Sequence, residues 1–490
     1  MSRLHVCGRI GAALLALVML GCAGVPERES KPSSMASLSL TNLPAPANAV
    51  AAWPAEDWWK SYSDPQLDAL IEYALRNSPT LGAASTRLAQ AAAAAGITRG
   101  EASVKAGADL NASYGRQSEN YMIPKPPLGK GGEWISQGST GIGMSYEIDL
   151  WGRHAAQIRA AQDLVDAAGF DHAAARLALT TSLVRSYAQL ATQHELLDLA
   201  TTTLKQRQAI TDLTRQRSAA GLDTQAEIRQ AETGTASLRA EQIQAQTAIA
   251  VTRLQLAYLS GALPDAAEKI SRPHMRLPAF NLPDHLPLDL LGRRPEIAVQ
   301  RARINAATEQ IEVARAQFYP NLNLNALVGF QSIGVSQLLA GGSFTTSIGP
   351  AIHLPLFDGG LLRANYRLKQ SRLEEAIALY NQAVVAAAQE TIEQLTRSAA
   401  LAGEAEATAA AHAATQENYR LAQLRYREGL VSRLAVLAAE NQLLVQQRTL
   451  INLKARRFEL QIALVRALGG GFADTRDVAT APAMQTPEKP

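Results

Sequence analysis

The chain has 490 residues and a formal net charge of only +3, with Lys and Arg interspersed among Asp and Glu. Binding to nucleic acid therefore has little support. Hydrophobic residues make up 47% and aromatics only 5%, and this composition, rich in Ala and Leu, favours long, closely packed helices. No run of about 20 apolar residues follows the N-terminal segment, so any membrane span must consist of strands.

Residues 1–21 are predicted to be an export signal, because two arginines and an apolar stretch precede Gly21 and Cys22. The end of this stretch resembles a lipoprotein signal-peptidase site, in which Cys22 is lipidated and begins the mature chain. The alternative is an ordinary secretory signal with an incidental cysteine. Cys7 lies within the signal, so Cys22 alone remains, and no disulfide, cysteine-based zinc site or catalytic thiol is expected. Residues 22–57 are predicted to be a lipid-anchored linker.

The chain contains an internal duplication. Asn77-Ser-Pro79 has a counterpart in Arg293-Arg-Pro295, and Ala220-Gly221-Leu222 has one in Glu428-Gly429-Leu430, each roughly 210 residues further on. These correspondences predict a first structural repeat at 58–263 and a second at 284–472. A Pro-rich connector at 264–283 joins them, and a disordered tail is expected at 473–490.

Each repeat contains two runs of alternating apolar and polar residues, at about 103–116 and 140–150 and at about 320–330 and 344–356. Such runs are long enough to cross a bilayer as tilted strands, with an apolar face toward lipid and a polar face toward a wet lumen. A half-buried sheet of a soluble sandwich shows the same alternation, but no further strands are predicted to cover the apolar faces. Four strands cannot close a barrel, which needs about eight, so the sequence predicts an oligomer.

A stretch without proline follows each strand pair, and a glycine turn interrupts it near 219–222 and near 427–431. The first arm, at about 153–219, would extend about 100 Å at 1.5 Å per residue. The returning arm, at about 223–260, is shorter, and a helix predicted at roughly 66–101 makes up the difference. Late in the chain, apolar residues recur at every seventh position, which indicates coiled-coil contact: Leu437, Leu444, Ile451, Phe458 and Val465.

Several motifs make the chain resemble the TolC-like outer membrane factors, in particular their lipoprotein branch. These motifs are Asp64-Pro-Gln-Leu67, Tyr146-Glu-Ile-Asp149-Leu-Trp-Gly152-Arg153, Leu290-Leu-Gly-Arg293-Arg294-Pro295-Glu296-Ile297 and Leu354-Pro-Leu-Phe357-Asp358-Gly359-Gly360. The likeness runs from about Trp58 to Phe472. It implies an α+β membrane protein, with a duplicated β-hairpin and long α-helical hairpin. Three copies would form a twelve-stranded β-barrel continuous with a periplasmic α-helical barrel.

The resemblance implies the channel subunit of a tripartite efflux pump in the outer membrane of a Gram-negative bacterium. The homotrimer would passively conduct drugs, toxic small molecules or metal ions from a periplasmic adaptor and an inner-membrane RND pump. The adaptor would meet the turns at Gly221 and Leu222 and at Gly429 and Leu430. No cofactor is implied. The exit duct of a type I protein secretion system is the alternative function.

Two further classes of protein have less support from the sequence. A periplasmic adaptor or scaffold would also be rich in Ala and coiled coil, but it would lack the four alternating strands. An enzyme would need a recognisable site, and the chain has no P-loop, dinucleotide-binding glycine pattern, nucleophile elbow or His/Glu metal spacing. The histidines are dispersed, and His353 is expected on the lumen face of a strand.

A periplasmic gate near the second glycine turn is also implied by the resemblance. Tyr426 matches the family's aromatic position, and Leu434 matches a constricting leucine. The family's acidic positions, six and nine residues after Gly429, are here Ala435 and Ala438, so an aspartate ring is not expected. Acidic groups of the first copy could replace it, or they could simply face water. The gate candidates are therefore Tyr426, Leu434, Glu227 and Asp223.

Overall fold

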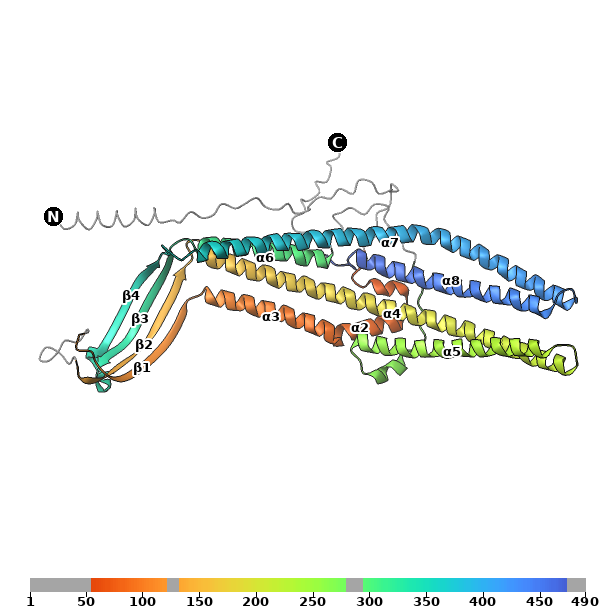
Figure 1. Cartoon of the computed structure of the whole chain (residues 1–490). Helices are drawn as coiled ribbons and strands as arrows, with labels where there is room; N and C mark the ends of the chain where they lie inside the picture. Colours follow the sequence, from red (N-terminus) through yellow and green to blue (C-terminus); the bar gives the residue numbers. More distant parts are fainter. Residues whose placement is uncertain (1–53, 121–131, 279–293, 474–490) are drawn as a thin grey trace, which may run out of the picture. The chain divides into compact units, whose positions relative to one another are not determined.

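The computed structural model describes residues 54–120, 132–278 and 294–473 (Figure 1). The predicted signal, Cys22 and nearly all of the linker lie outside these ranges, as do residues 279–283 of the connector and the tail from residue 474. The elements follow in the order η1 (Trp58–Tyr62), α2 (Pro65–Asn77), α3 (Pro79–Glu101), β1 (Lys105–Arg116), β2 (Trp134–Ile148), α4 (Arg153–Ala219), α5 (Gln225–Ser260), η2 (Pro264–Lys269), α6 (Pro295–Ala316), β3 (Asn321–Ile333), η4 (Val335–Gln337), η5 (Gly341–Ser343), β4 (Phe344–His353), α7 (Leu361–Arg427) and α8 (Arg433–Ala467).

The order of elements repeats within the described chain. A strand pair precedes a long helix in both halves, and α4 and α7 each contain 67 residues. The returning helices α5 and α8 are shorter, with 36 and 35 residues. The shorter helices α2 and α3 lie before the first strand pair, and α6 lies before the second.

The compact units of the fold do not coincide with the sequence repeats. The strand unit comprises described residues 88–120, 132–168 and 300–380. The hairpin unit comprises described residues 54–87, 169–278, 294–299 and 381–473. Each unit draws on both repeats, and in the strand unit β2 of the first repeat pairs with β3 of the second.

The strand unit contains an antiparallel sheet in the order β1-β2-β3-β4 (Figure 1). Its register places Ala106, Met144, Ala326 and Ile348 side by side across the sheet. Neighbouring positions along each strand point to the opposite face, where Lys105, Ser145, Asn325 and Gly349 form the adjacent row. The sheet therefore has one apolar and one polar face, and the apolar face is exposed in the single chain.

Three strand ends differ from the expected positions. β2 begins at Trp134 rather than near 140, because its first residues pair with the end of β1 and Trp134 stacks on Tyr114 with ring centroids 5.5 Å apart. β3 continues to Ile333, still paired with β2. β4 ends at His353, and Pro355 just beyond it has no N–H to donate to a strand partner.

In each repeat, an aspartate between the strand pair and the long helix accepts hydrogen bonds from backbone N–H groups where the helix begins. Asp149 accepts hydrogen bonds from the backbone N–H groups of His154 (3.2 Å) and Ala155 (2.9 Å) at the start of α4. Asp358 accepts from Gly360 (2.9 Å) and Leu362 (2.7 Å) at the start of α7. These carboxylates satisfy N–H groups that have no partner within the helix, which gives the two repeated aspartate motifs a structural role.

The core of the hairpin unit is built around completely buried side chains on α2, α4, α5 and α8: Leu67, Ile71, Leu183, Leu256 and Ile462. Asp64, just before α2, is buried against this core and accepts hydrogen bonds from the Tyr187 hydroxyl (2.9 Å) and the His274 backbone N–H (2.7 Å). Burial raises the pKa of Tyr187 above its usual range. Asp64 thus joins α2, α4 and the connector.

Candidate channel entrance at the hairpin tips

The two helical hairpins of the hairpin unit end in turns of the same geometry. Gly221 has φ 74° and Gly429 has φ 73°, a left-handed conformation that glycine adopts without steric strain. The N–H of Leu222 donates to the carbonyl five residues earlier (2.9 Å), and that of Leu430 makes the equivalent bond (2.8 Å). This pattern ends a helix by satisfying its last carbonyls. The side chains of Leu222 and Leu430 are 67% and 73% exposed, so both tips present a leucine to solvent.

Both acidic candidates of the first tip have local partners. Asp223 accepts a hydrogen bond from the Arg217 guanidinium (2.9 Å). Glu227 closes a capping box at the start of α5: its carboxylate accepts from the Thr224 backbone N–H (2.6 Å), and its own N–H donates to the Thr224 hydroxyl (3.4 Å). Each carboxylate therefore stabilises the turn. A role in gating would come in addition to this structural role.

The second tip lacks this acidic arrangement. Ser432 precedes α8 without a capping hydrogen bond from its side chain, and Ala435 occupies the place that Glu227 has in the first copy. The Arg433 guanidinium lies over the Tyr426 ring, 5.4 Å from its centroid. Leu434, the other gate candidate, is 57% exposed. The structure thus brings Tyr426 next to an arginine that the sequence analysis did not single out.

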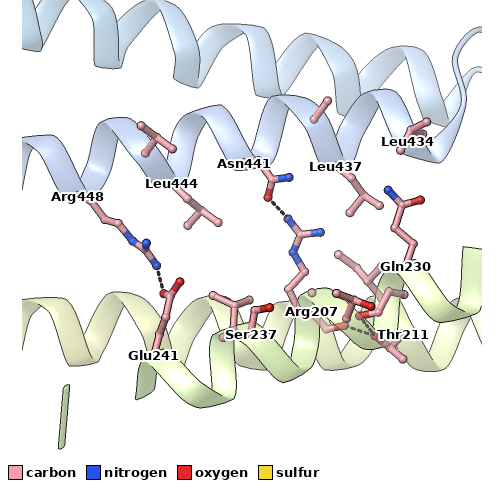
Figure 2. Close-up of a pocket in the computed structure, with 17 residues that line it drawn as sticks. Arg207, Thr211, Gln230, Ser237, Glu241, Leu434, Leu437, Asn441, Leu444 and Arg448 are labelled. Atoms are coloured by element: carbon pink, nitrogen blue, oxygen red, sulfur yellow. Dashed lines mark hydrogen bonds and ion pairs between the residues drawn. The ribbon is translucent and has the colours of Figure 1, made fainter. Parts of the chain in front are cut away.

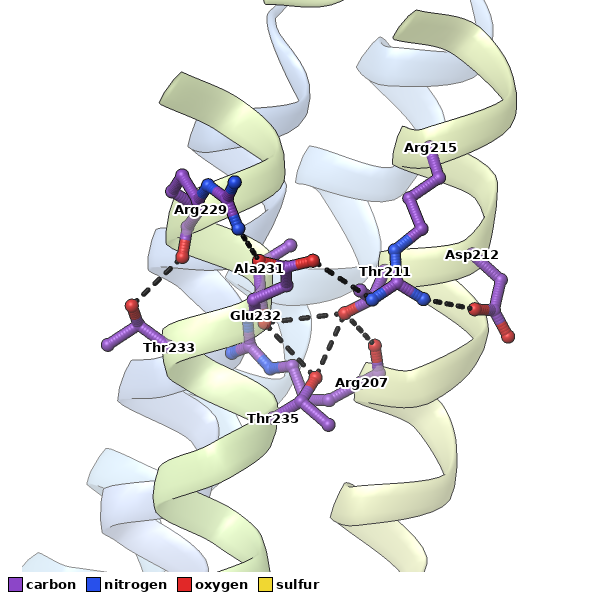
Figure 3. Close-up of polar contacts among 9 residues, drawn as sticks. All are labelled: Arg207, Thr211, Asp212, Arg215, Arg229, Ala231, Glu232, Thr233 and Thr235. Carbon is purple, nitrogen blue, oxygen red and sulfur yellow. Dashed lines mark hydrogen bonds and ion pairs between the residues drawn. The ribbon is translucent and has the colours of Figure 1, made fainter. Parts of the chain in front are cut away.

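A polar cluster joins α4 to α5 behind the first tip (Figure 3). The Thr211 hydroxyl contacts the Ala231 carbonyl (3.3 Å) and the Thr235 hydroxyl (2.9 Å) on the facing helix. Glu232 pairs with Arg215 of α4 (2.9 Å) and with Arg229 of α5 (2.9 Å), and these guanidiniums lower its pKa. The cluster fixes the two helices of the first hairpin against each other.

A groove of about 730 Å³ separates the first hairpin from α8 (Figure 2). Leucines of α8 line one side, including Leu437 and Leu444, which the heptad pattern assigns to coiled-coil contact. Small residues of α5, Ala231 and Gly234 among them, line the other side. The leucine stripe is not tightly packed here, since an open groove separates these leucines from the first hairpin. Further along α8, Phe458 and Val465 of the same stripe are buried in the core.

Two polar bridges cross the groove (Figure 2). Arg207 of α4 lies 3.3 Å from the Glu440 carboxylate of α8, and its guanidinium also donates to the Asn441 side chain. These two ionic side chains are only 10% and 5% exposed. Arg448 of α8 pairs with Glu241 of α5 in a more open position. The sequence analysis missed both bridges, although a charged residue inside the leucine stripe, as at position 440, is a signal that could have indicated a buried partner.

The described residues contain no helix that is long and apolar enough to cross a membrane. The same ranges hold no group of three or more His, Cys, Asp or Glu side chains that could bind a metal ion. His353 pairs with Asn321 in the sheet, at the ends of β3 and β4.

An amphipathic sheet whose apolar face is exposed is typical of proteins that cross an outer membrane with strands. A family model described as outer membrane efflux protein matches residues 70–262 and 286–470. The chain therefore belongs to the outer membrane efflux protein family.

Similar proteins agree with this assignment. The fusaric acid resistance protein FusA of Burkholderia cepacia is 35% identical over 366 residues, covering 73% of this chain and 68% of FusA. The multidrug resistance outer membrane protein MdtP of Escherichia coli (strain K12) is 30% identical over 486 residues, covering 96% and 97%. The crystal structure of the outer membrane protein VceC from Vibrio cholerae matches with 37% identity and a TM-score of 0.80, covering 86% of this chain and all of VceC. The outer-membrane channel OprN matches with 26% identity and a TM-score of 0.79, covering 91% and 99%.

Proposed function

We propose that three copies of this chain close a twelve-stranded barrel in the outer membrane and a tube of helical hairpins in the periplasm. The single observation that carries this proposal is the open sheet. Within the described residues, β1 and β4 each pair with one strand only, and Leu110 and Ile348 on the apolar face are 74% and 77% exposed. Four strands cannot close a barrel, and unpaired edges are unfavourable in lipid, so further copies must supply the missing strands.

Aromatic pairs at both ends of β2 support a position within a membrane. Tyr114 stacks on Trp134 where β2 begins, and Trp151 stacks on Tyr319 just beyond its end, with ring centroids 4.7 Å apart. Trp134 and Trp151 remain 61% and 49% exposed. Aromatic side chains are enriched at the two membrane–water interfaces of barrel proteins, so the apolar rows between these pairs would face lipid.

The assembled channel would conduct its cargo passively to the outside of a Gram-negative cell. A periplasmic adaptor would dock at the exposed tips around Leu222 and Leu430, and an inner-membrane RND pump would supply the energy. The channel itself would have no enzymatic activity. The names of FusA, of MdtP and of the pyoverdine export protein OpmQ, which is 30% identical over 422 residues, support small organic molecules as cargo.

The N-terminal segment would attach each copy to the membrane. Residues 1–21 would be removed as the signal, Cys22 would carry the lipid, and residues 22–57 would link it to the first repeat. The second repeat at 284–472 would follow the connector.

The periplasmic end would close near Tyr426 and Leu434, with Asp223 and Glu227 supplying acidic groups. We expect Glu227→Ala to increase channel leak and to reduce its sensitivity to cations, because a carboxylate that attracts them is lost. Conductance in planar bilayers measures both the leak and the sensitivity to cations. Thr224→Ala is the matched control, since it breaks the same capping box but keeps the carboxylate. Unchanged conductance in Glu227→Ala, or the same change in Thr224→Ala, would remove a charge-based role for Glu227.

The proposed function is tested with the purified full-length protein. We expect it to fractionate with the outer membrane, to migrate as a trimer before heating, and to form discrete pores in planar bilayers. Deletion of the gene should sensitise cells to some members of a panel of drugs, dyes and metals. A monomeric protein absent from the outer membrane would refute the proposal. Loss of secretion of a protein, with unchanged sensitivity to the panel, would favour the type I secretion duct instead.

A further inference from the structure

Three arginines gather at the second hairpin tip: Arg425 and Arg427 in the last turn of α7, and Arg433 at the start of α8. We call them the tip arginines. Arg425 and Arg427 are exposed, and in the described part of the chain neither has a carboxylate partner. The Arg433 guanidinium rests on the Tyr426 ring, and its Nε has no hydrogen-bond partner among the described residues. In contrast, Arg420, less than two turns before Arg425, pairs with Glu417 (2.7 Å).

The carboxylates nearest to the tips do not balance these charges. Between Arg420 and Arg433 the second hairpin carries four arginines and one acidic residue, Glu428. The first two turns of α8 add no acid, because Ala435 and Ala438 are exposed where acidic side chains could stand.

The acids of the first tip are already matched by arginines of the same hairpin. Asp223 is bound to Arg217, whereas Asp212 and Glu232 share Arg215 and Arg229. Glu227, held in its capping box, and Glu428 are two acidic residues against the three tip arginines. The hairpin tips of one chain therefore carry a net positive charge.

We propose that this positive charge makes the periplasmic entrance selective for anions, so that the cargo carries a carboxylate, a phosphate or a similar negative group. The inference rests on the proposed function, because three copies around one axis place the tip arginines in a ring at the end of the tube. Rings of Arg or Lys favour anions in pores, and clefts lined by one sign of charge concentrate the opposite ion. Dissolved salt screens a charge beyond about 8 Å at physiological ionic strength. The ring of arginines therefore affects passing ions where the passage is narrow.

The test is the reversal potential of the full-length protein in planar bilayers under a KCl gradient. We expect the wild-type pore to prefer chloride over potassium. The double variant Arg425→Gln/Arg427→Gln should move the reversal potential toward zero, and Arg425→Glu/Arg427→Glu should change its sign. Arg457→Gln is the matched control: Arg457 is exposed on α8, has no carboxylate partner among the described residues, and lies far along the helix from the tip. It should retain the wild-type value.

Each outcome decides the inference. Wild-type pores that prefer potassium would overturn it, as would an unchanged reversal potential in both double variants. An equal shift in Arg457→Gln would also overturn it, because the effect would then not belong to the tip. If Arg425→Glu/Arg427→Glu fails to form trimers, the reversal potential of Arg425→Gln/Arg427→Gln alone decides the test. Wild-type protein that forms no pores would refute the proposed function itself, whereas pores with cation preference refute only the inference. Loss of adaptor binding with unchanged selectivity would show that the tip arginines serve docking instead.

Discussion

Replacing Arg207 with alanine is expected to destabilise the hairpin unit by about 3–5 kcal/mol, because it leaves Glu440 as a buried charge without its partner. The Glu440 side chain is only 5% exposed, and the Arg207 guanidinium is the cation that approaches it (3.3 Å). Thermal or denaturant unfolding of the purified protein, followed by circular dichroism, measures the change in the free energy of unfolding.

The second bridge across the groove supplies the matched control. Arg448 and Glu241 are 40% and 38% exposed, so water already screens this pair, and Arg448→Ala should change stability by only about 0–1 kcal/mol. The double replacement Arg207→Met/Glu440→Leu should recover most of the loss, since it removes both buried charges together. Equal effects of Arg207→Ala and Arg448→Ala would show that burial does not set the strength of the first bridge.

Replacing Gly329 with alanine is expected to disrupt the pairing of β2 with β3. An added Cβ would lie 2.2 Å from the Thr140 carbonyl oxygen and 2.6 Å from the Gly141 Cα. Both contacts are with backbone atoms, so the two strands would have to separate at the point where Gly141 and Gly329 face each other. Overpacking of this kind costs about 1–3 kcal/mol or more. The measurement is the fraction of folded, heat-modifiable trimer recovered from the outer membrane.

Gly143 provides the comparison on the neighbouring strand, because a Cβ there would meet no atom within 4 Å. Gly143→Ala should therefore give the wild-type yield of trimer. Similar yields for the two variants would contradict the argument that close backbone approach, rather than flexibility, requires glycine at position 329.

Local signals in the sequence predicted the strands and the long helices. The helix expected at roughly 66–101 is instead divided into α2 and α3, because Ser78, just before Pro79, has an extended backbone conformation. The alternation from Lys105 onward indicates a strand because side chains along an extended backbone point to opposite faces. The glycines at 221 and 429 indicate turns because a left-handed residue commonly ends a helix. Strand ends were less predictable: β2 begins at Trp134 because its early residues pair with β1, which depends on the neighbouring strand.

What the sequence by itself determined, then, is the repeated order of elements and the positions of the two tips, and it predicts that the open sheet needs partners. Only the tertiary structure decided which residues meet. It paired Gly141 with Gly329 and Arg207 with Glu440, residues far apart in the chain. It also bound Asp223 to Arg217 and left Arg425 and Arg427 without carboxylate partners among the described residues. The physical reason is that periodicity and turn chemistry act over a few residues, whereas burial and charge pairing depend on the helix or strand that packs alongside.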